Sequence, residues 1–222
     1  MRPKAILSWS SGKDSAWSLE VLRQQGEVEV VALLTTINAA HDRVAMHAVR
    51  RGLLLRQAEA AGVELWPVFI PWPCSNEDYE AAMRAALERA RDVGITVVAF
   101  GDLFLEDIRR YREEKLAGTG LRLVFPLWRK PTGALAREMI AGGLRARLTC
   151  VDPKHLARSF AGREFDEALI DALPEAVDPC GERGEFHTFA YDGPMFTCPV
   201  PVTSGDVVER DGFIFADLLG PT

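Results

Sequence analysis

The first 131 residues alternate between short apolar runs and longer amphipathic stretches, and this alternation constrains the fold more than any other feature of the sequence. Apolar residues recur at helical spacing in the stretches that end at Gly26, Gly62 and Gly94, and again over 106–116. The compact apolar runs predict five strands, at residues 5–9, 28–37, 65–70, 95–100 and 121–127. Because strands and helices of these lengths form βαβ units, we predict a doubly wound α/β fold with a mostly parallel five-stranded sheet.

The helix that ends at Gly94 has the clearest boundaries in the sequence. Asn76 is a residue type that favours the N-cap position, and Glu77 and Asp78 would lie in the first turn, where the helix dipole favours negative charge. We therefore predict that Asn76 caps this helix.

The regular alternation is lost from Thr132 onward. The pattern there predicts a helix over 133–141, a strand over 146–151 and a helix over 164–173, followed by short β-like pieces among Pro and Gly residues. We predict an α/β domain over 1–131 and a smaller α+β region over 132–222 that packs against the sheet.

Composition places the chain among ordinary globular proteins, with 48 % hydrophobic and 26 % charged residues. The formal net charge of -6 argues against a general nucleic-acid binder, so a nucleic-acid partner is not expected. No stretch approaches the roughly 18 apolar residues of a membrane span. The four cysteines form no C-x-x-C pair, which argues against a zinc ribbon and favours a reducing compartment. We expect a soluble, cytoplasmic protein, and a homodimer would be compatible with this composition.

The strongest local signal is the segment Ser10-Ser11-Gly12-Lys13-Asp14-Ser15, between the first predicted strand and the first predicted helix. This position lies at the carboxyl end of a strand, where doubly wound sheets bind ligands. Small residues let backbone N–H groups approach a phosphate, and the helix start, the lysine and the serine hydroxyls add further donors. An ordinary helix N-terminus is the alternative interpretation, since Ser and Asp are also favoured there.

The segment departs from a Walker A loop at two positions. Leu7 stands where that motif has its first glycine, and Asp14 follows the lysine in place of Ser or Thr. A carboxylate inside a phosphate loop repels phosphate unless a metal ion lies between them. Asp14 is therefore predicted to bind Mg²⁺.

This loop resembles the pyrophosphate loop, S-G-G-x-D-S, of the N-type ATP pyrophosphatases, in the adenine-nucleotide alpha-hydrolase superfamily. These enzymes cleave ATP between its α- and β-phosphates and adenylate an oxygen of the substrate, and a nitrogen or sulfur nucleophile then displaces AMP. The resemblance implies that Ser10, Ser11, Gly12, Lys13, Asp14, Ser15, Thr35 and Gly101 bind the nucleotide.

Further motifs resemble the diphthine–ammonia ligase family, in the family's order and over nearly the whole chain. They are Gly101-Asp102-Leu103, Arg109, Pro126-Leu127-Trp128 and the segment CGERGEFHTF at 180–189. The family patterns are close to G-D-I, Q-R-x-R, P-L-W and C-G-E-G-G-E-[FY]-E-T-F. Ile108 replaces the family glutamine, Arg183 a family glycine and His187 a family glutamate, which suggests a subgroup whose acceptor differs from diphthine.

The resemblance also proposes roles for individual side chains. Lys13, Asp14, Asp102, Glu182 and Glu185 are predicted to be catalytic, with Asp102 holding Mg²⁺ or ammonium and the two glutamates binding and deprotonating ammonium. His47, Arg109 and His187 are predicted to contact the substrate. Structural alternatives remain for each of them: an N-cap for Asp102, a solvated helix face for Arg109, a helix residue for His47 and a tight glycine turn for the glutamates.

Together these features predict an ATP-dependent, AMP-forming amide ligase that uses Mg²⁺ and ammonia, with the region over 132–222 on the substrate side. The resemblance implies diphthine on an elongation factor 2-like protein as acceptor, and an unknown carboxylate substrate stays open. One rival is a transfer-RNA-modifying enzyme of the same superfamily. The other is an adenine-nucleotide sensor without catalysis.

Overall fold

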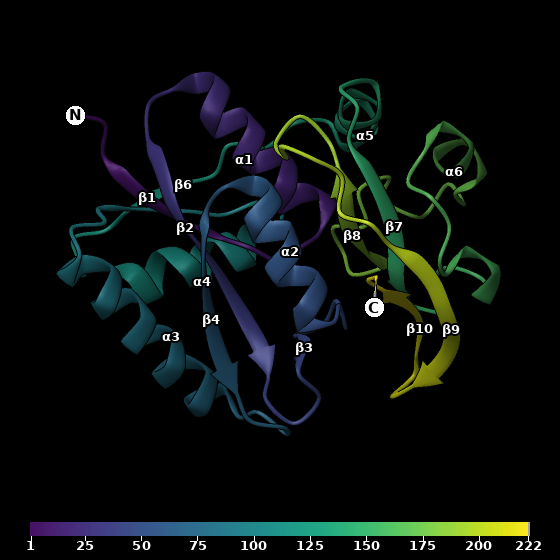
Figure 1. The fold of residues 1–222 in the computed structure, drawn as a ribbon, viewed down its shortest axis with the longest axis horizontal. Helices are drawn as coiled ribbons and strands as arrows, with labels where there is room; N and C mark the ends of the chain where they lie inside the picture. The colour runs from purple at the N-terminus through teal and green to yellow at the C-terminus, as the bar shows by residue number, and fades with distance from the viewer. Residues whose placement is uncertain (222) are drawn as a thin grey trace.

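Five parallel strands form the central sheet of the computed structural model, which describes residues 1–221 (Figure 1). They are β1 (Lys4–Ser8), β2 (Glu29–Asn38), β4 (Glu64–Ile70), β5 (Val97–Ala99) and β6 (Arg122–Val124). Pairing gives the order β4–β2–β1–β5–β6, so the direction of winding reverses at β1. The predicted five-stranded, mostly parallel sheet is confirmed. A short strand, β3 (Arg43–Val44), pairs antiparallel with the end of β2 and was not predicted.

Four helices cover the two faces of this sheet. They are α1 (Lys13–Gln25), α2 (Arg51–Ala61), α3 (Asn76–Asp92) and α4 (Glu106–Leu116). Along β1, Leu7 belongs to the apolar cluster that includes α1 and α2, whereas Ile6 belongs to the cluster that includes α3 and α4. This alternation puts a helical layer on each side, as a doubly wound fold requires.

The helix ends follow local sequence rules, with one correction. Gly26 ends α1 in the left-handed conformation (φ 65°), and its N–H donates to the carbonyl of Leu22. The predicted cap Asn76 is wrong, because Ser75 is the N-cap of α3. The Ser75 hydroxyl accepts the Asp78 N–H at 3.1 Å and the Asp78 carboxylate accepts the Ser75 N–H at 3.4 Å. This reciprocal capping box satisfies two N–H groups, whereas a cap by Asn76 satisfies one.

The C-terminal region is built on a second, antiparallel sheet of order β8–β7–β10–β9. Its elements are α5 (Thr132–Ala141), β7 (Arg145–Val151), a 3₁₀ turn (Arg158–Phe160), α6 (Glu167–Ala172), β8 (Phe186–Asp192), β9 (Thr203–Arg210) and β10 (Phe213–Leu219). The predicted α+β character, the helix near 133–141 and the strand near 146–151 are confirmed, and the predicted helix over 164–173 shortens to α6. Three regular strands replace the expected short β-like pieces. β9 escaped prediction because its residues are polar and largely exposed.

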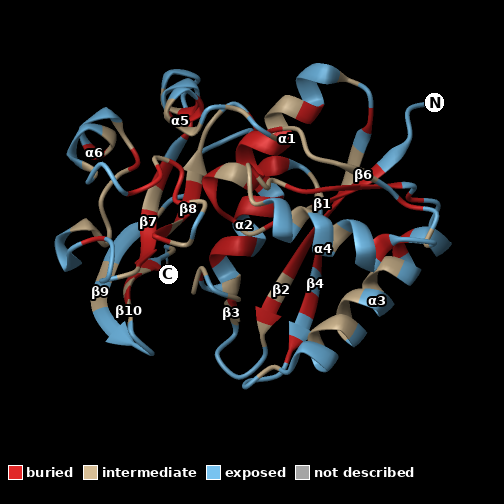
Figure 2. Ribbon diagram, turned by 180° about the vertical axis from the view of Figure 1, so that it is seen from behind, coloured by how far each residue is buried: buried red, intermediate tan, exposed pale blue. Residues whose placement is uncertain are grey.

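One continuous apolar cluster joins the two regions, running from Trp9 and Ala16 to Phe186 and Phe189. Figure 2 shows buried residues along the strands of both sheets and a largely exposed α3. Strand β8 reaches the loop after β1, since the Ala190 N–H donates to the carbonyl of Ser11 at 3.0 Å. The C-terminal region therefore supplies one wall of whatever the loop binds.

Within residues 1–221, no helix combines the length and the apolar character needed to cross a bilayer.

Candidate active site

A cavity of about 590 Å³ opens at the carboxyl end of the parallel sheet. Its walls come from the loop after β1, the ends of β2 and β4, the segment after β5, the loop that follows β3, and residues 180–182 and 186–188. The cavity therefore lies at the point where the strand order reverses, which is where open α/β sheets bind ligands.

The loop after β1 presents its two outer serines to this cavity. Ser10 and Ser15 line the cavity, with their hydroxyl oxygens 3.3 Å apart. Ser11 is buried in the left-handed conformation (φ 68°), and Gly12 packs so tightly that an added Cβ would lie 2.9 Å from Cε1 of His47. Ser11 and Gly12 thus shape the loop without lining the cavity with side chains.

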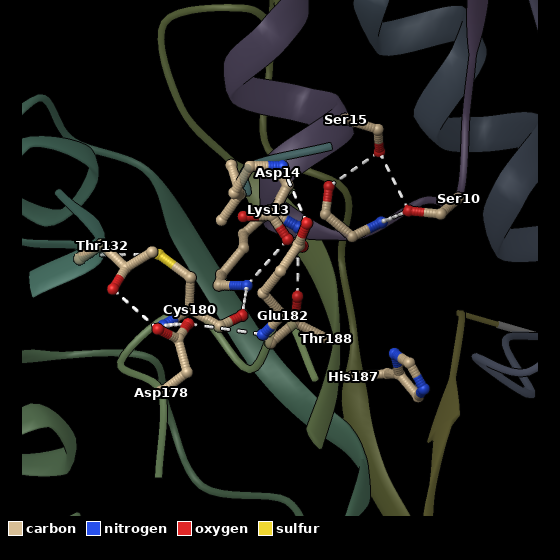
Figure 3. Close-up of polar contacts among 12 residues, drawn as sticks. Ser10, Lys13, Asp14, Ser15, Thr132, Asp178, Cys180, Glu182, His187 and Thr188 are labelled. Atoms are coloured by element: carbon tan, nitrogen blue, oxygen red, sulfur yellow. Dashed lines mark hydrogen bonds and ion pairs between the residues drawn. The ribbon is translucent and has the colours of Figure 1, made fainter. Parts of the chain in front are cut away.

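Lys13 is buried and connects the loop after β1 to the C-terminal region. Its Nζ donates to Oδ2 of Asp14 at 2.8 Å and to the carbonyl of Cys180 (Figure 3). The same Nζ lies 5.5 and 5.3 Å from the ring centroids of Phe165 and Phe186. Burial disfavours the ammonium, but the Asp14 carboxylate outweighs it and raises the pKa of Lys13. Lys13 is therefore charged, and its charge holds Asp14 in place.

Asp14 retains one uncommitted carboxylate oxygen. Its Oδ1 is buried without a hydrogen-bond partner among the described residues, and the side chain lines the cavity. Burial raises the pKa of Asp14, and Lys13 opposes this shift. A buried carboxylate oxygen without a donor is a suitable ligand for a hard cation, so the residues present fit the predicted Mg²⁺.

Asp102 lies in the same cavity wall but is already paired. Both of its oxygens accept from Arg112, at 2.5 Å from Nε and 3.0 Å from Nη2, and the guanidinium lies 4.2 Å from the ring centroid of Phe100. The bidentate pair leaves Asp102 little capacity for a cation or ammonium. Gly101 beside it allows a close approach, because a Cβ there would lie 3.2 Å from the Asp14 carbonyl group.

Glu182 and Glu185 have different environments. Glu182 lines the cavity, and its Oε1 accepts the Leu103 N–H at 2.7 Å. Burial raises the pKa of Glu182 to about 7, against that hydrogen bond and with support from the nearby Asp14 carboxylate. Such a carboxyl group can exchange a proton near neutral pH.

Glu185 is buried behind the turn, where its carboxylate accepts the N–H groups of Asp178 and Arg183, each at 3.0 Å. The structure places Glu185 outside the cavity wall, so the prediction that both glutamates face the substrate is corrected for this residue. Its role here is to hold the turn.

The Cys180 thiol is also buried. Burial raises the pKa of this thiol far above its usual range, which leaves the cysteine unreactive.

His47 and His187 both line the cavity, and their ring centroids are 4.6 Å apart. Nδ1 of His47 lies 3.1 Å from the carbonyl oxygen of Thr188. Burial lowers the pKa of His47 to about 4 and that of His187 to about 3, so both rings are neutral at pH 7.

Besides Ser11, Gly12 and Glu185, two further predicted site residues lie outside the cavity wall. Arg109 pairs with Glu113 at 2.7 Å on the exposed side of α4, and its guanidinium lies 4.8 Å from the ring centroids of Phe125 and Trp128. An i,i+4 ion pair thus accounts for Arg109. The buried Thr35 hydroxyl donates to the carbonyl of Trp9 at 2.7 Å, which supports the loop from behind.

Sequence reasoning missed four side chains that shape the cavity. Arg112 holds Asp102, Tyr79 and Trp72 line the wall, and the hydroxyl of Thr188 accepts the Lys13 N–H at 3.0 Å. Arg110 and Arg112 have the R-x-R spacing of the family motif, one position later than the register that puts Ile108 at its glutamine, and that shift could have pointed to Arg112. Tyr79 and Trp72 carry no local signal, because the fold alone brings them to the site.

Two family models match this chain. The diphthamide synthase N-terminal domain matches residues 3–123, and the diphthamide synthase C-terminal domain matches residues 131–214. The chain belongs to the diphthamide synthase family. Similar proteins include the diphthine–ammonia ligase of Danio rerio, 31% identical over 188 residues that cover 79% of this chain and 71% of that protein.

Mammalian relatives cover more of the chain at lower identity. The diphthine–ammonia ligase of Homo sapiens is 27% identical over 244 aligned positions, and that of Mus musculus is 26% identical over the same length. Both alignments cover 97% of this chain and 88% of the relative. The homology is therefore distant but spans both regions of the fold.

Proposed function

We propose that this protein is an ATP-dependent, AMP-forming amide ligase that adenylates a substrate carboxylate and transfers ammonia to it. The observation that carries the proposal is the phosphate-type loop at the switch point of the sheet, where Lys13 fixes Asp14 and leaves its Oδ1 free. Membership of the diphthamide synthase family supports the same chemistry.

The loop would hold the leaving pyrophosphate. Ser10, Ser15 and the N-terminal end of α1 line the cavity. The Ser15 hydroxyl donates to the Gly12 carbonyl at 2.9 Å and would have to turn in order to donate to a phosphate. Mg²⁺ bound by Asp14 would neutralise phosphate charge during cleavage between the α- and β-phosphates. The loop, the helix end and Asp14 would thus stabilise negative charge where it develops.

Glu182 would handle the nitrogen donor. An ammonium ion attracted to the carboxylates of this wall can give one proton to Glu182, whose pKa of about 7 lies near the working pH. The resulting ammonia then attacks the acyl carbon of the adenylated substrate, and AMP leaves. Glu185 and Lys13 take part by holding the turn and the loop against each other.

We propose diphthine on an elongation factor 2-like protein as the first acceptor to test, because the relatives are named diphthine–ammonia ligases. Another carboxylate substrate is the alternative. His187, where the family pattern has glutamate, lies in the cavity wall, so a change of acceptor would act through this position.

The test is acceptor-dependent exchange of labelled pyrophosphate into ATP. Asp14→Asn should abolish exchange while the circular dichroism spectrum stays near that of the wild type; thermal unfolding should move to lower temperature, because the buried Lys13 loses its carboxylate partner. Asp107→Asn is the matched control, since Asp107 is an exposed carboxylate in the first turn of α4. Full exchange in Asp14→Asn would rule out the metal role. Formation of ADP in place of AMP would contradict the whole proposal.

A further inference from the structure

His47 and His187 reach the cavity from segments that are 140 residues apart in sequence, the loop after β3 and the strand β8. Their rings are in contact and are tilted against each other by 37°. Figure 3 shows His187 apart from the cluster of Lys13, Asp14 and Glu182. The imidazoles therefore form a second polar part of the wall, separate from the carboxylates.

The contacts of His47 fix which ring nitrogen carries the proton. Nδ1 lies 3.1 Å from the carbonyl oxygen of Thr188, which can only accept a hydrogen bond, so Nδ1 bears the hydrogen. In the neutral ring Nε2 is then an unprotonated acceptor. Cε1, the atom between the two nitrogens, packs against Gly12, which places Nε2 beside the phosphate-type loop.

The surroundings keep this pair uncharged. Besides the two histidines, the titratable and charged side chains that share the cavity are Lys13, Asp14, Cys74, Tyr79, Asp102, Arg112, Cys180 and Glu182. Of these, Lys13 acts on both histidines and disfavours their protonation, in addition to the effect of burial. Asp14 and Asp102 are paired with Lys13 and Arg112, so no carboxylate among the described residues pairs with either imidazole.

Amide formation from ammonium releases two protons. The first leaves before attack and, in the proposed function, goes to Glu182. The second leaves after the nitrogen lone pair has formed the C–N bond, as the C–O bond breaks and its electron pair departs with AMP. This second proton needs another acceptor near the acyl carbon, because Glu182 already carries the first.

We propose that Nε2 of His47 accepts this second proton, and that His187 is a positioning residue that packs against the His47 ring and keeps the Nε2 lone pair facing the cavity. This inference rests on the proposed function for the reaction. The geometry of base and orienting group matches the general pattern of acid–base catalysis, in which a carbonyl fixes the tautomer of the base.

One experiment needs no acceptor. Protein labelled with ¹⁵N-histidine should show His47 with hydrogen on Nδ1 and with a titration midpoint below pH 5, and His47→Gln assigns the signal. His187→Glu places a carboxylate beside the ring and should raise that midpoint by more than one pH unit, whereas His187→Gln should not. A hydrogen on Nε2 of His47, or a midpoint unmoved by His187→Glu, would overturn the proposal.

A second experiment measures the reaction with diphthine-bearing elongation factor 2 and ammonium. His47→Gln should slow amide formation about 100-fold and leave pyrophosphate exchange within threefold of the wild type, and added imidazole should restore part of the rate in His47→Ala. Equal loss of both steps, or unchanged amide formation, would refute a role in proton transfer. His155→Gln, an exposed histidine outside the cavity, is the control.

The two experiments separate the inference from the proposed function. If the wild type gives no exchange with this acceptor, the proposed acceptor is wrong, and the spectroscopic titration still decides whether His47 offers a free Nε2. If exchange and amide formation proceed but His47→Gln leaves both unchanged, the proposed function stands and the inference falls.

Discussion

Replacing His187 should change how the stability of this protein depends on pH. In the folded protein burial lowers the pKa of His187 to about 3, whereas an unfolded histidine has a pKa of about 6.5. Between these values unfolding takes up a proton, so the free energy of unfolding falls as the pH falls. His187 alone should cost about 2 kcal/mol of stability between pH 7 and pH 5.

His187→Gln removes the pH-dependent contribution of His187 to the free energy of unfolding and should leave the contributions of the other titratable groups unchanged. His47 also lowers the free energy of unfolding as the pH falls, because its pKa in the folded protein is lowered to about 4. Glu182 acts in the opposite sense: its raised pKa of about 7 makes the folded state take up a proton first, so it stabilises the fold as the pH falls. Both terms occur in the wild type and in the variant and cancel in the comparison.

The assay is urea unfolding of the wild type and His187→Gln at pH 7, 6 and 5. The stability advantage of the wild type over the variant should shrink by about 2 kcal/mol from pH 7 to pH 5. An advantage that stays constant within about 0.5 kcal/mol would refute the idea that the fold holds this imidazole neutral. His155→Gln is the matched control for loss of a histidine.

Two further substitutions test contacts around the same cavity. Gly12→Ala places a Cβ 2.9 Å from Cε1 of His47. It should therefore destabilise the protein by about 1–3 kcal/mol in thermal unfolding and shift the ¹⁵N signal of the His47 ring. Unchanged stability and an unchanged ¹⁵N spectrum would contradict the close packing. Asp217→Asn removes the carboxylate that pairs with Arg43 and Arg50, at 2.9 and 2.6 Å, which tie the loop bearing His47 to β10. Hydrogen exchange should accelerate over residues 43–50 but not in β1, whereas Asp211→Asn, in the turn between β9 and β10, should change neither.

Local sequence rules predicted the parts of the fold that depend on neighbouring residues. The apolar runs of β1 and β2 and the glycine that ends α1 carry their signals within a few positions. The antiparallel sheet depends on partners far along the chain, and the exposed β9 gains its strand conformation by pairing with β10. That pairing leaves no periodic signal in the sequence.

In the candidate site, too, local motifs predicted some features, and contacts between distant parts of the chain decided the others. Motif spacing predicted a shared site for Ser10, Asp14 and Glu182, and the structure brings these three residues to one cavity. It gave the wrong orientation for Glu185, because neighbouring residues of a tight turn point to opposite sides and only the tertiary packing decides which one is buried. Lys13 and Arg109 were predicted to meet ligands, yet each finds its partners within the protein.

The pairing of charges in the cavity bears on how a nucleotide could bind there. Both basic side chains in the described wall are already matched, Lys13 by Asp14 and Arg112 by Asp102. A triphosphate entering this wall meets serine hydroxyls and a helix end but no spare cation. Since Oδ1 of Asp14 has no hydrogen-bond donor among the described residues, a bound cation would be coordinated by this oxygen and would neutralise charge on the phosphate. Lys13 holds the Asp14 carboxylate and connects it to the turn that carries Glu182, so it would orient that carboxylate for such a cation.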